Sequence, residues 1–204
     1  MPAVQSLKSS FILAFFLAFG FNSFSQTQEY DCLALQAESE VIVEGRANVG
    51  RFKCNTRPLQ TDKPIPSCFE KSFDGIRITN VQFDIPIDDF NCGNPLVLND
   101  LKDVLESDEH PAIQFTLKEL LVHQTSSSVY DGNVKALTNV RGVDHPIIMP
   151  VEVIELAPKR YKISGQTTIR LSWYSIEQPS RFFGLLVLEE DVDVCFELYF
   201  TKSK

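Results

Sequence analysis

The fold of this chain is decided by residues 90–117, which read FNCGNPLVLNDLKDVLESDEHPAIQFTL. Apolar side chains recur in the middle of this stretch at the i, i+3 and i+4 spacing of one helix face, at Leu101, Val104 and Leu105. Asn99 or Asp100 can cap such a helix, and Pro111 can end it, because the residue before a proline avoids helical geometry. The pattern predicts a short helix of about two to three turns.

Directly after Pro111 the apolar period changes from that of a helix to that of a strand. Ile113, Phe115 and Leu117 alternate with polar residues and would share one face of a sheet. Elsewhere the chain carries short alternating segments between turn signals, about eight or nine in all, which is typical of an all-β barrel or sandwich. The clearest of them is the last, with apolar residues at Val192, Val194, Phe196, Leu198 and Phe200.

The N-terminal residues 1–25 have the features of a secretory signal peptide. One lysine precedes an uncharged apolar run at 11–21, whose length of about 11 residues suits a signal sequence and is too short to span a bilayer. Ser23 and Ser25 place small residues before a cleavage site, which predicts a processed domain at 26–204. The sequence therefore predicts export to the periplasm or the extracellular space, with an uncleaved membrane anchor as the alternative.

Composition and missing motifs restrict the function. The chain has 204 residues and a formal net charge of −8, with no cluster of Lys and Arg, so we expect no nucleic-acid partner. A P-loop, a GxGxxG stretch and a GxSxG elbow are absent from the sequence. His110, His123 and His145 lack the paired spacings of zinc sites. We therefore expect no cofactor, no metal and no catalysis, although composition alone leaves a Ser–His–Asp triad open.

All five cysteines lie beyond the signal peptide, at Cys32, Cys54, Cys68, Cys92 and Cys195. Export favours disulfides, and two bridges would leave one thiol unpaired. Cys54 and Cys92 each begin a polar turn after a strand-like segment, which favours them as one bridge, with Cys68 as a rival partner for either. The alternative is that the thiols are buried and unpaired.

Four motifs, in this order, resemble the YceI-like family of exported bacterial proteins. The first is NCGNPL at 91–96, followed by the predicted helix, and the second is HPAIQF at 110–115. The third is LTNVRGVDHPI at 137–147, and the fourth is FFGLLVLEEDV at 182–192. Together they cover roughly residues 39–200. The resemblance implies an extended antiparallel eight-stranded lipocalin-like β-barrel with one short helix after the second long strand.

The resemblance also implies that a long isoprenoid or similar amphiphilic lipid binds in a tunnel, without catalysis. Asn139, Asp144 and the proline-rich loop at 55–72 depart from the family pattern and leave the identity of the ligand open. A true lipocalin would carry Gly-x-Trp near its first strand, but this chain has Gly45-Arg-Ala there and its single tryptophan is Trp173. The expected partner is an isoprenoid-like lipid, with a homodimer left open.

Inward-facing apolar residues of the strands would form the wall of such a tunnel. The candidate ligand-binding residues are Phe83, Ile85, Phe115, Leu117, Ile169, Leu171, Trp173, Phe183, Phe196 and Leu198. Their apolar surfaces would remove a lipid chain from water. The same residues could instead fill the barrel as its core, which would make the protein a structural or interaction protein of the cell envelope. An enzyme acting on an apolar substrate is a third hypothesis, and it requires converging titratable groups that the inward positions lack.

Overall fold

The structure is a computed structural model that describes residues 32–48, 50–56, 59, 65–177, 180–181 and 186–203. The predicted signal peptide at 1–25 lies outside the described residues. No helix within the described ranges is both long enough and apolar enough to cross a membrane.

Strands dominate the described part of the chain, with one α-helix and two short 3-10 helices. In chain order the elements are β1 (Cys32–Leu35), β2 (Glu40–Ala47), β3 (Gly50–Thr56), β4 (Ile65–Pro66), β5 (Cys68–Lys71), β6 (Gly75–Thr79), β7 (Val81–Pro86), η1 (Ile87–Asp89), β8 (Phe90–Asn91), α1 (Pro95–Leu105), β9 (Ala112–Gln124), β10 (Val129–Val140), β11 (Val143–Ala157), β12 (Arg160–Arg170), η2 (Leu171–Tyr174), β13 (Ser180–Arg181) and β14 (Leu186–Ser203).

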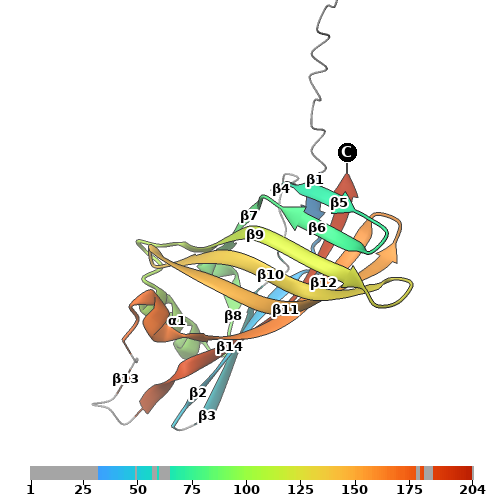
Figure 1. The fold of residues 1–204 in the computed structure, drawn as a ribbon. Coiled ribbons are helices and arrows are strands. Elements are labelled where there is room, and N and C mark those ends of the chain that lie inside the picture. Colours follow the sequence, from blue (N-terminus) through green and yellow to red (C-terminus); the bar gives the residue numbers. More distant parts are fainter. Residues whose placement is uncertain are drawn as a thin grey trace, which may run out of the picture.

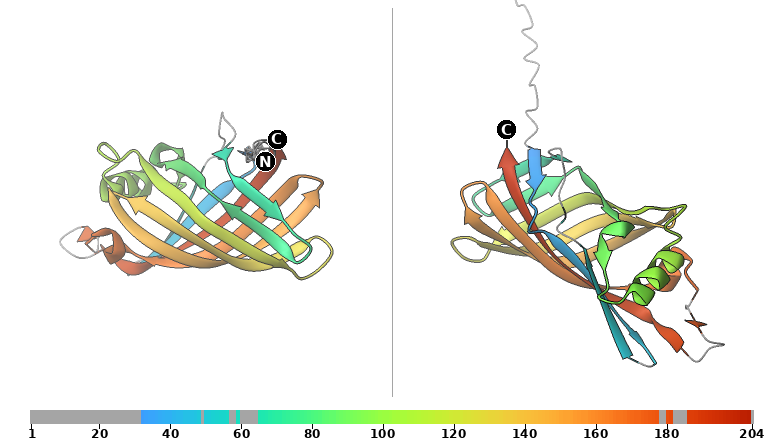
Figure 2. Two further views of the ribbon diagram at one scale, coloured as in Figure 1. Left: turned by 45° about the horizontal axis from the view of Figure 1, so that its top comes forward. Right: turned by 180° about the vertical axis from the view of Figure 1, so that it is seen from behind.

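The strands form a 14-stranded sheet in which every ladder is antiparallel. Its main path runs β5-β6-β9-β10-β11-β12-β14-β2-β3-β8. The long strands β9 to β12 follow one another as a meander and, with β14, curve into a trough (Figures 1 and 2). The prediction of an all-β antiparallel fold with a helix is confirmed.

The prediction of a closed eight-stranded barrel is wrong, because no ladder joins the two ends of this path among the described residues. The covalent chain crosses the gap instead. β7 pairs with β9 at one edge, η1 follows, and β8 pairs with β3 at the other edge. The Cys54–Cys92 disulfide ties β3 to the residue that follows β8, and so fixes this crossing. We call this gap between the two ends of the sheet the seam. β8 has two residues, and these carry too few backbone hydrogen-bonding groups to complete a ladder across it.

Helix α1 begins at Pro95, about one and a half turns before the predicted start, so the prediction that Asn99 or Asp100 caps it is wrong. Asn94 is the cap: its side-chain oxygen accepts a hydrogen bond from the backbone N–H of Leu96 at 2.9 Å. Pro95 suits the first helical position, because its fixed φ is helical and its missing N–H would have no partner there.

The C-terminal end of α1 also differs from the prediction that Pro111 ends it. The helix ends at Leu105, and Glu106 adopts a left-handed conformation with φ of 51°. The backbone N–H of Glu106 bonds to the carbonyl of Asp103, and that of Ser107 bonds to the carbonyl of Lys102. These bonds satisfy carbonyls of the last turn without any contribution from the proline.

The Asn94 cap can be tested by substitution. We expect Asn94→Ala to lower the free energy of unfolding by about 1 kcal/mol, because it leaves a helix N–H without its acceptor. Asn94→Asp keeps a side-chain oxygen that can accept this hydrogen bond and should stay near wild type. Asn99→Ala changes an exposed position inside the helix and should be neutral or slightly stabilising. Urea unfolding of the three variants checks this, and a larger loss for Asn99→Ala than for Asn94→Ala would contradict the assigned helix start.

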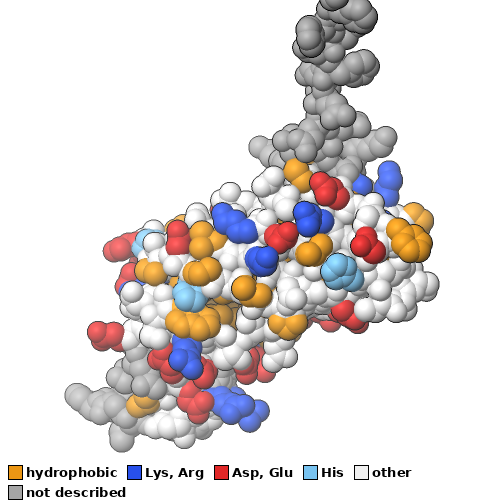
Figure 3. Space-filling model, viewed as in Figure 1, with side chains coloured by type: hydrophobic (Ala, Val, Ile, Leu, Met, Phe, Trp, Pro, Cys, Tyr) orange, Lys and Arg blue, Asp and Glu red, His pale blue; other side chains and the backbone are white. Residues whose placement is uncertain are grey.

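The outer face of the sheet is polar and mixed in charge. Acidic and basic side chains are interspersed on the face drawn in Figure 3, with scattered apolar side chains between them. Some of the charges pair across strands, as Lys135 does with Glu119 at 3.0 Å. The inner face carries the buried apolar residues, including the alternating Ile147, Met149 and Val151 of β11. The core therefore lies inside the curve of the sheet.

Candidate ligand-binding site

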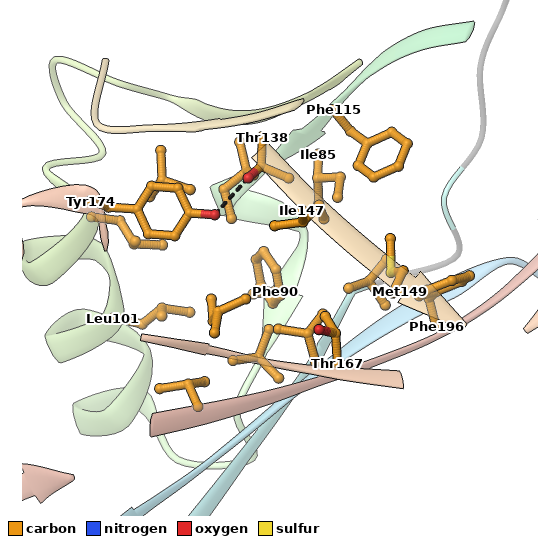
Figure 4. Close-up of a pocket in the computed structure, with 18 of the residues that line it drawn as sticks. Ile85, Phe90, Leu101, Phe115, Thr138, Ile147, Met149, Thr167, Tyr174 and Phe196 are labelled. Atoms are coloured by element: carbon orange, nitrogen blue, oxygen red, sulfur yellow. Dashed lines mark hydrogen bonds between the residues drawn. The ribbon is translucent and has the colours of Figure 1, made fainter. Parts of the chain in front are cut away.

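The curved sheet and helix α1 enclose a cavity of about 460 Å³. Its walls are formed by inward-facing side chains from strands along the whole curve of the sheet, and nearly all of these side chains are apolar (Figure 4). Among the lining side chains that the structure describes, the ones with polar groups are Arg51, Asp100, Thr138, Thr167 and Tyr174. A cavity of this size and lining is typical of sites that enclose most of a small apolar ligand.

Strand alternation places the wall residues. In β14 the side chains of Val192, Val194 and Phe196 line the cavity, and residues between them face away. In β9 the alternation changes phase, because Glu119 pairs with Lys135 while Leu117 pairs with the next residue of β10. The intervening residue is a β-bulge, and as a result both Leu117 and Leu120 line the cavity.

Helix α1 forms one end of the cavity. Val97, Leu101, Val104 and Leu105 line it, and their i, i+4, i+7 and i+8 spacing puts them on one helix face. Figure 4 shows Leu101 directed into the cavity beside Phe90 of β8. The helix therefore covers one end of the apolar interior, and Val97, Leu98 and Leu101 pack it against the core.

Two hydroxyl groups meet inside this apolar wall. Tyr174 is 2% exposed, and its Oη lies 2.5 Å from the Oγ1 of Thr138 in β10. The same Oγ1 donates to the carbonyl oxygen of His145 at 3.1 Å. Burial raises the pKa of the Tyr174 hydroxyl, so this group keeps its proton at neutral pH. Figure 4 shows the Tyr174 hydroxyl directed toward Thr138 across the cavity wall.

A model of the YceI-like domain family matches residues 36–200. The chain belongs to the YceI-like family. No curated protein gives a significant match to the sequence. Among solved structures, BcnA of Burkholderia cenocepacia is similar at 15% identity and a TM-score of 0.56, over 80% of this chain and 96% of BcnA. A polyisoprenoid-binding domain of Saccharophagus degradans implicated in plant cell wall breakdown is similar at 14% identity and a TM-score of 0.57, over 84% of this chain and 98% of that domain. At these identities the likeness shows the shared fold.

Most of the predicted wall residues of this YceI-like chain lie together around the cavity. The ones that line it are Phe83, Ile85, Phe115, Leu117, Ile169, Leu171, Phe196 and Leu198. Phe183 lies outside the described residues. Contact between these residues and a ligand stays a prediction.

Trp173 does not line the cavity, contrary to the prediction for its position. The alternation that predicted it ends with β12 at Arg170, and η2 follows. In a 3-10 helix, residues three apart share a face, so Leu171 and Tyr174 point to the cavity and Trp173 points elsewhere. The Trp173 ring instead stacks on His145, with 4.4 Å between ring centroids.

The YceI-like chain contains the predicted disulfide. Cys54 and Cys92 are bonded, which confirms the favoured pair and rules out Cys68 as a partner of either. Cys32, Cys68 and Cys195 are free. Cys54 is completely buried in the hydrophobic core, and the bond therefore anchors the β3–β8 edge to the core.

One group of possible cation ligands escaped the sequence analysis. Glu106, Glu109 and His110 of this YceI-like domain bring three ligand atoms within 4.8 Å of one another after α1. The expectation of no metal depended on spacings between histidines, which do not detect this Glu-x-x-Glu-His pattern. Glu106 already pairs with the guanidinium of Arg141, and both glutamates are exposed. The absence of a metal site stays a prediction.

Proposed function

We propose that this protein binds one long-chain isoprenoid or similar amphiphilic lipid in its cavity, without changing it chemically, as an exported carrier or sensor. The observation that carries the proposal is the apolar cavity of about 460 Å³ inside a YceI-like sheet. Each methylene group that such a cavity removes from water contributes up to about 0.8 kcal/mol to binding. The Saccharophagus degradans domain with the same fold, which is named for polyisoprenoid binding, supports the choice of ligand class.

The polar groups of the cavity support binding rather than catalysis. General acid–base or nucleophilic catalysis uses side chains that converge on the reacting atom, such as a nucleophile within hydrogen-bond distance of a base. Of the described lining side chains, Arg51, Asp100 and Tyr174 carry ionisable groups, and they lie on three separate elements, β3, α1 and η2. The Tyr174 hydroxyl already bonds to Thr138. Arg51 is exposed at the rim of the cavity. The cavity also counts against the alternative of a filled barrel with a purely structural role.

Native mass spectrometry of the processed protein, purified from its own host, tests this function directly. We expect a complex with one lipid per chain, and extraction into organic solvent should release a long-chain isoprenoid or a similar amphiphile. The same spectrum gives the mass of the polypeptide, which should begin at Gln26 if residues 1–25 are removed on export. A ligand-free mass, together with no uptake of added isoprenoids, would contradict the proposal and favour the structural role.

A further inference from the structure

The buried hydroxyls of Tyr174 and Thr138 have a fixed direction of hydrogen bonding. A carbonyl oxygen can only accept, so the 3.1 Å contact between Thr138 Oγ1 and the His145 carbonyl uses the single proton of the threonine. The 2.5 Å contact between the two hydroxyls must then use the proton of the tyrosine. The hydrogen bonds therefore run in one direction, from Tyr174 through Thr138 to the backbone of β11.

This direction determines what the pair can offer to a ligand. Both protons are used within the protein, and the remaining lone pairs of the two oxygens can only accept. Tyr174 and Thr138 both line the cavity, together with the apolar Val140, Leu171 and Ile176. The His145 imidazole lies edge-on to the Tyr174 ring, with 5.9 Å between ring centroids, but is not among the cavity-lining residues. A ligand atom next to these two hydroxyl oxygens is therefore beside hydrogen-bond acceptors, and none of these lining residues offers it a side-chain donor.

We propose that Tyr174 sets the specificity of the cavity by selecting a ligand whose buried polar end is an uncharged hydrogen-bond donor, such as a primary alcohol. This inference rests on the proposed function and names the head group of its ligand. An alcohol donates to Tyr174 Oη and is satisfied. The oxygen of an aldehyde, ketone or quinone is itself an acceptor, so no proton would lie between it and Tyr174 Oη. A carboxylate would in addition bring an unpaired charge into an apolar cavity.

The test uses three isoprenoid ligands of one chain length, the free alcohol, its methyl ether and its aldehyde, in competition with a fluorescent long-chain probe. We expect the wild-type protein to bind the alcohol about tenfold more tightly than the ether or the aldehyde. Tyr174→Phe keeps the ring and removes the oxygen, so the alcohol should lose affinity and bind no more tightly than the ether or the aldehyde.

Thr138→Val provides the sharper comparison. It removes the acceptor that holds the Tyr174 proton, so the tyrosine becomes free to donate into the cavity. The aldehyde should then gain affinity, about tenfold relative to wild type, and the preference for the alcohol should disappear. A merely structural role for the pair would weaken all three ligands equally in both variants.

The outcomes separate the two proposals. Equal affinity of the wild-type protein for all three ligands, or a preference for the aldehyde, would overturn the inference about Tyr174 and leave lipid binding intact. A wild-type protein that takes up none of the three ligands would overturn lipid binding and this inference together.

Discussion

Replacement of both Cys54 and Cys92 by alanine is expected to lower the free energy of unfolding by about 4 kcal/mol, according to the loop-entropy relation for a bridge that closes a loop of this length. The bonded residues are 38 positions apart in the sequence. Without the bond, the unfolded chain gains the freedom of that loop. The folded state also loses its tie at the seam, where β8 contributes just two ladder pairs, Asn55 with Asn91 and Thr56 with Phe90.

Urea unfolding of the oxidised proteins measures this loss. Cys68→Ser is the matched control, because Cys68 is a half-buried free thiol and its replacement should change the free energy of unfolding by about 0.5 kcal/mol or less. Reduction of the wild-type protein should reproduce the loss seen in the double variant and have no effect on that variant. If the double variant is no less stable than Cys68→Ser, the disulfide does not hold the seam.

Away from the bulge in β9, the inward faces of the long strands could be predicted from the sequence because their side chains follow a period of two. In β14 this period runs from Val192 to Phe200, and Phe196, which the sequence predicts to face inward, lines the cavity. The family resemblance added the antiparallel fold and the position of the helix. These features are local in sequence, and each strand displays them independently of its neighbours.

The features that the sequence did not reveal depend on contacts between distant segments. Closure of the sheet depends on whether the β7 and β3 edges pair, and neither strand carries a local signal for it. The 3-10 turn that brings Tyr174 into the cavity occupies four residues whose alternation resembles a continued strand. The start of α1 is an exception, because its signal is local: a capping residue, Asn94, followed by a proline is typical of a helix start. Whether the interior is empty or filled depends on side-chain volumes summed over the whole sheet.

Thr167→Trp should abolish tight lipid binding without unfolding the protein. Thr167 lies on β12 and lines the cavity opposite apolar side chains, so an indole at this position would extend into space that the ligand needs (Figure 4). If the indole displaces three methylene groups of a bound chain, the cost is about 2.4 kcal/mol, or roughly 60-fold in Kd. The new side chain fills a cavity and does not crowd a packed core, so the free energy of unfolding should change by less than about 1 kcal/mol.

Thr168→Trp is the control for this experiment, because the neighbouring threonine is exposed on the outer face of the same strand. Its hydroxyl bonds to Asp193 at 2.6 Å, and loss of this surface contact should leave lipid affinity at the wild-type level. Competition with the fluorescent long-chain probe gives Kd for both variants, and urea unfolding confirms that each is folded. If the two tryptophans have equal effects on binding, the lipid does not occupy the interior of the sheet. If only Thr167→Trp weakens lipid binding, the ligand and the indole compete for one enclosed volume. That result would show that the lipid binds inside the cavity and not to an apolar patch on the surface.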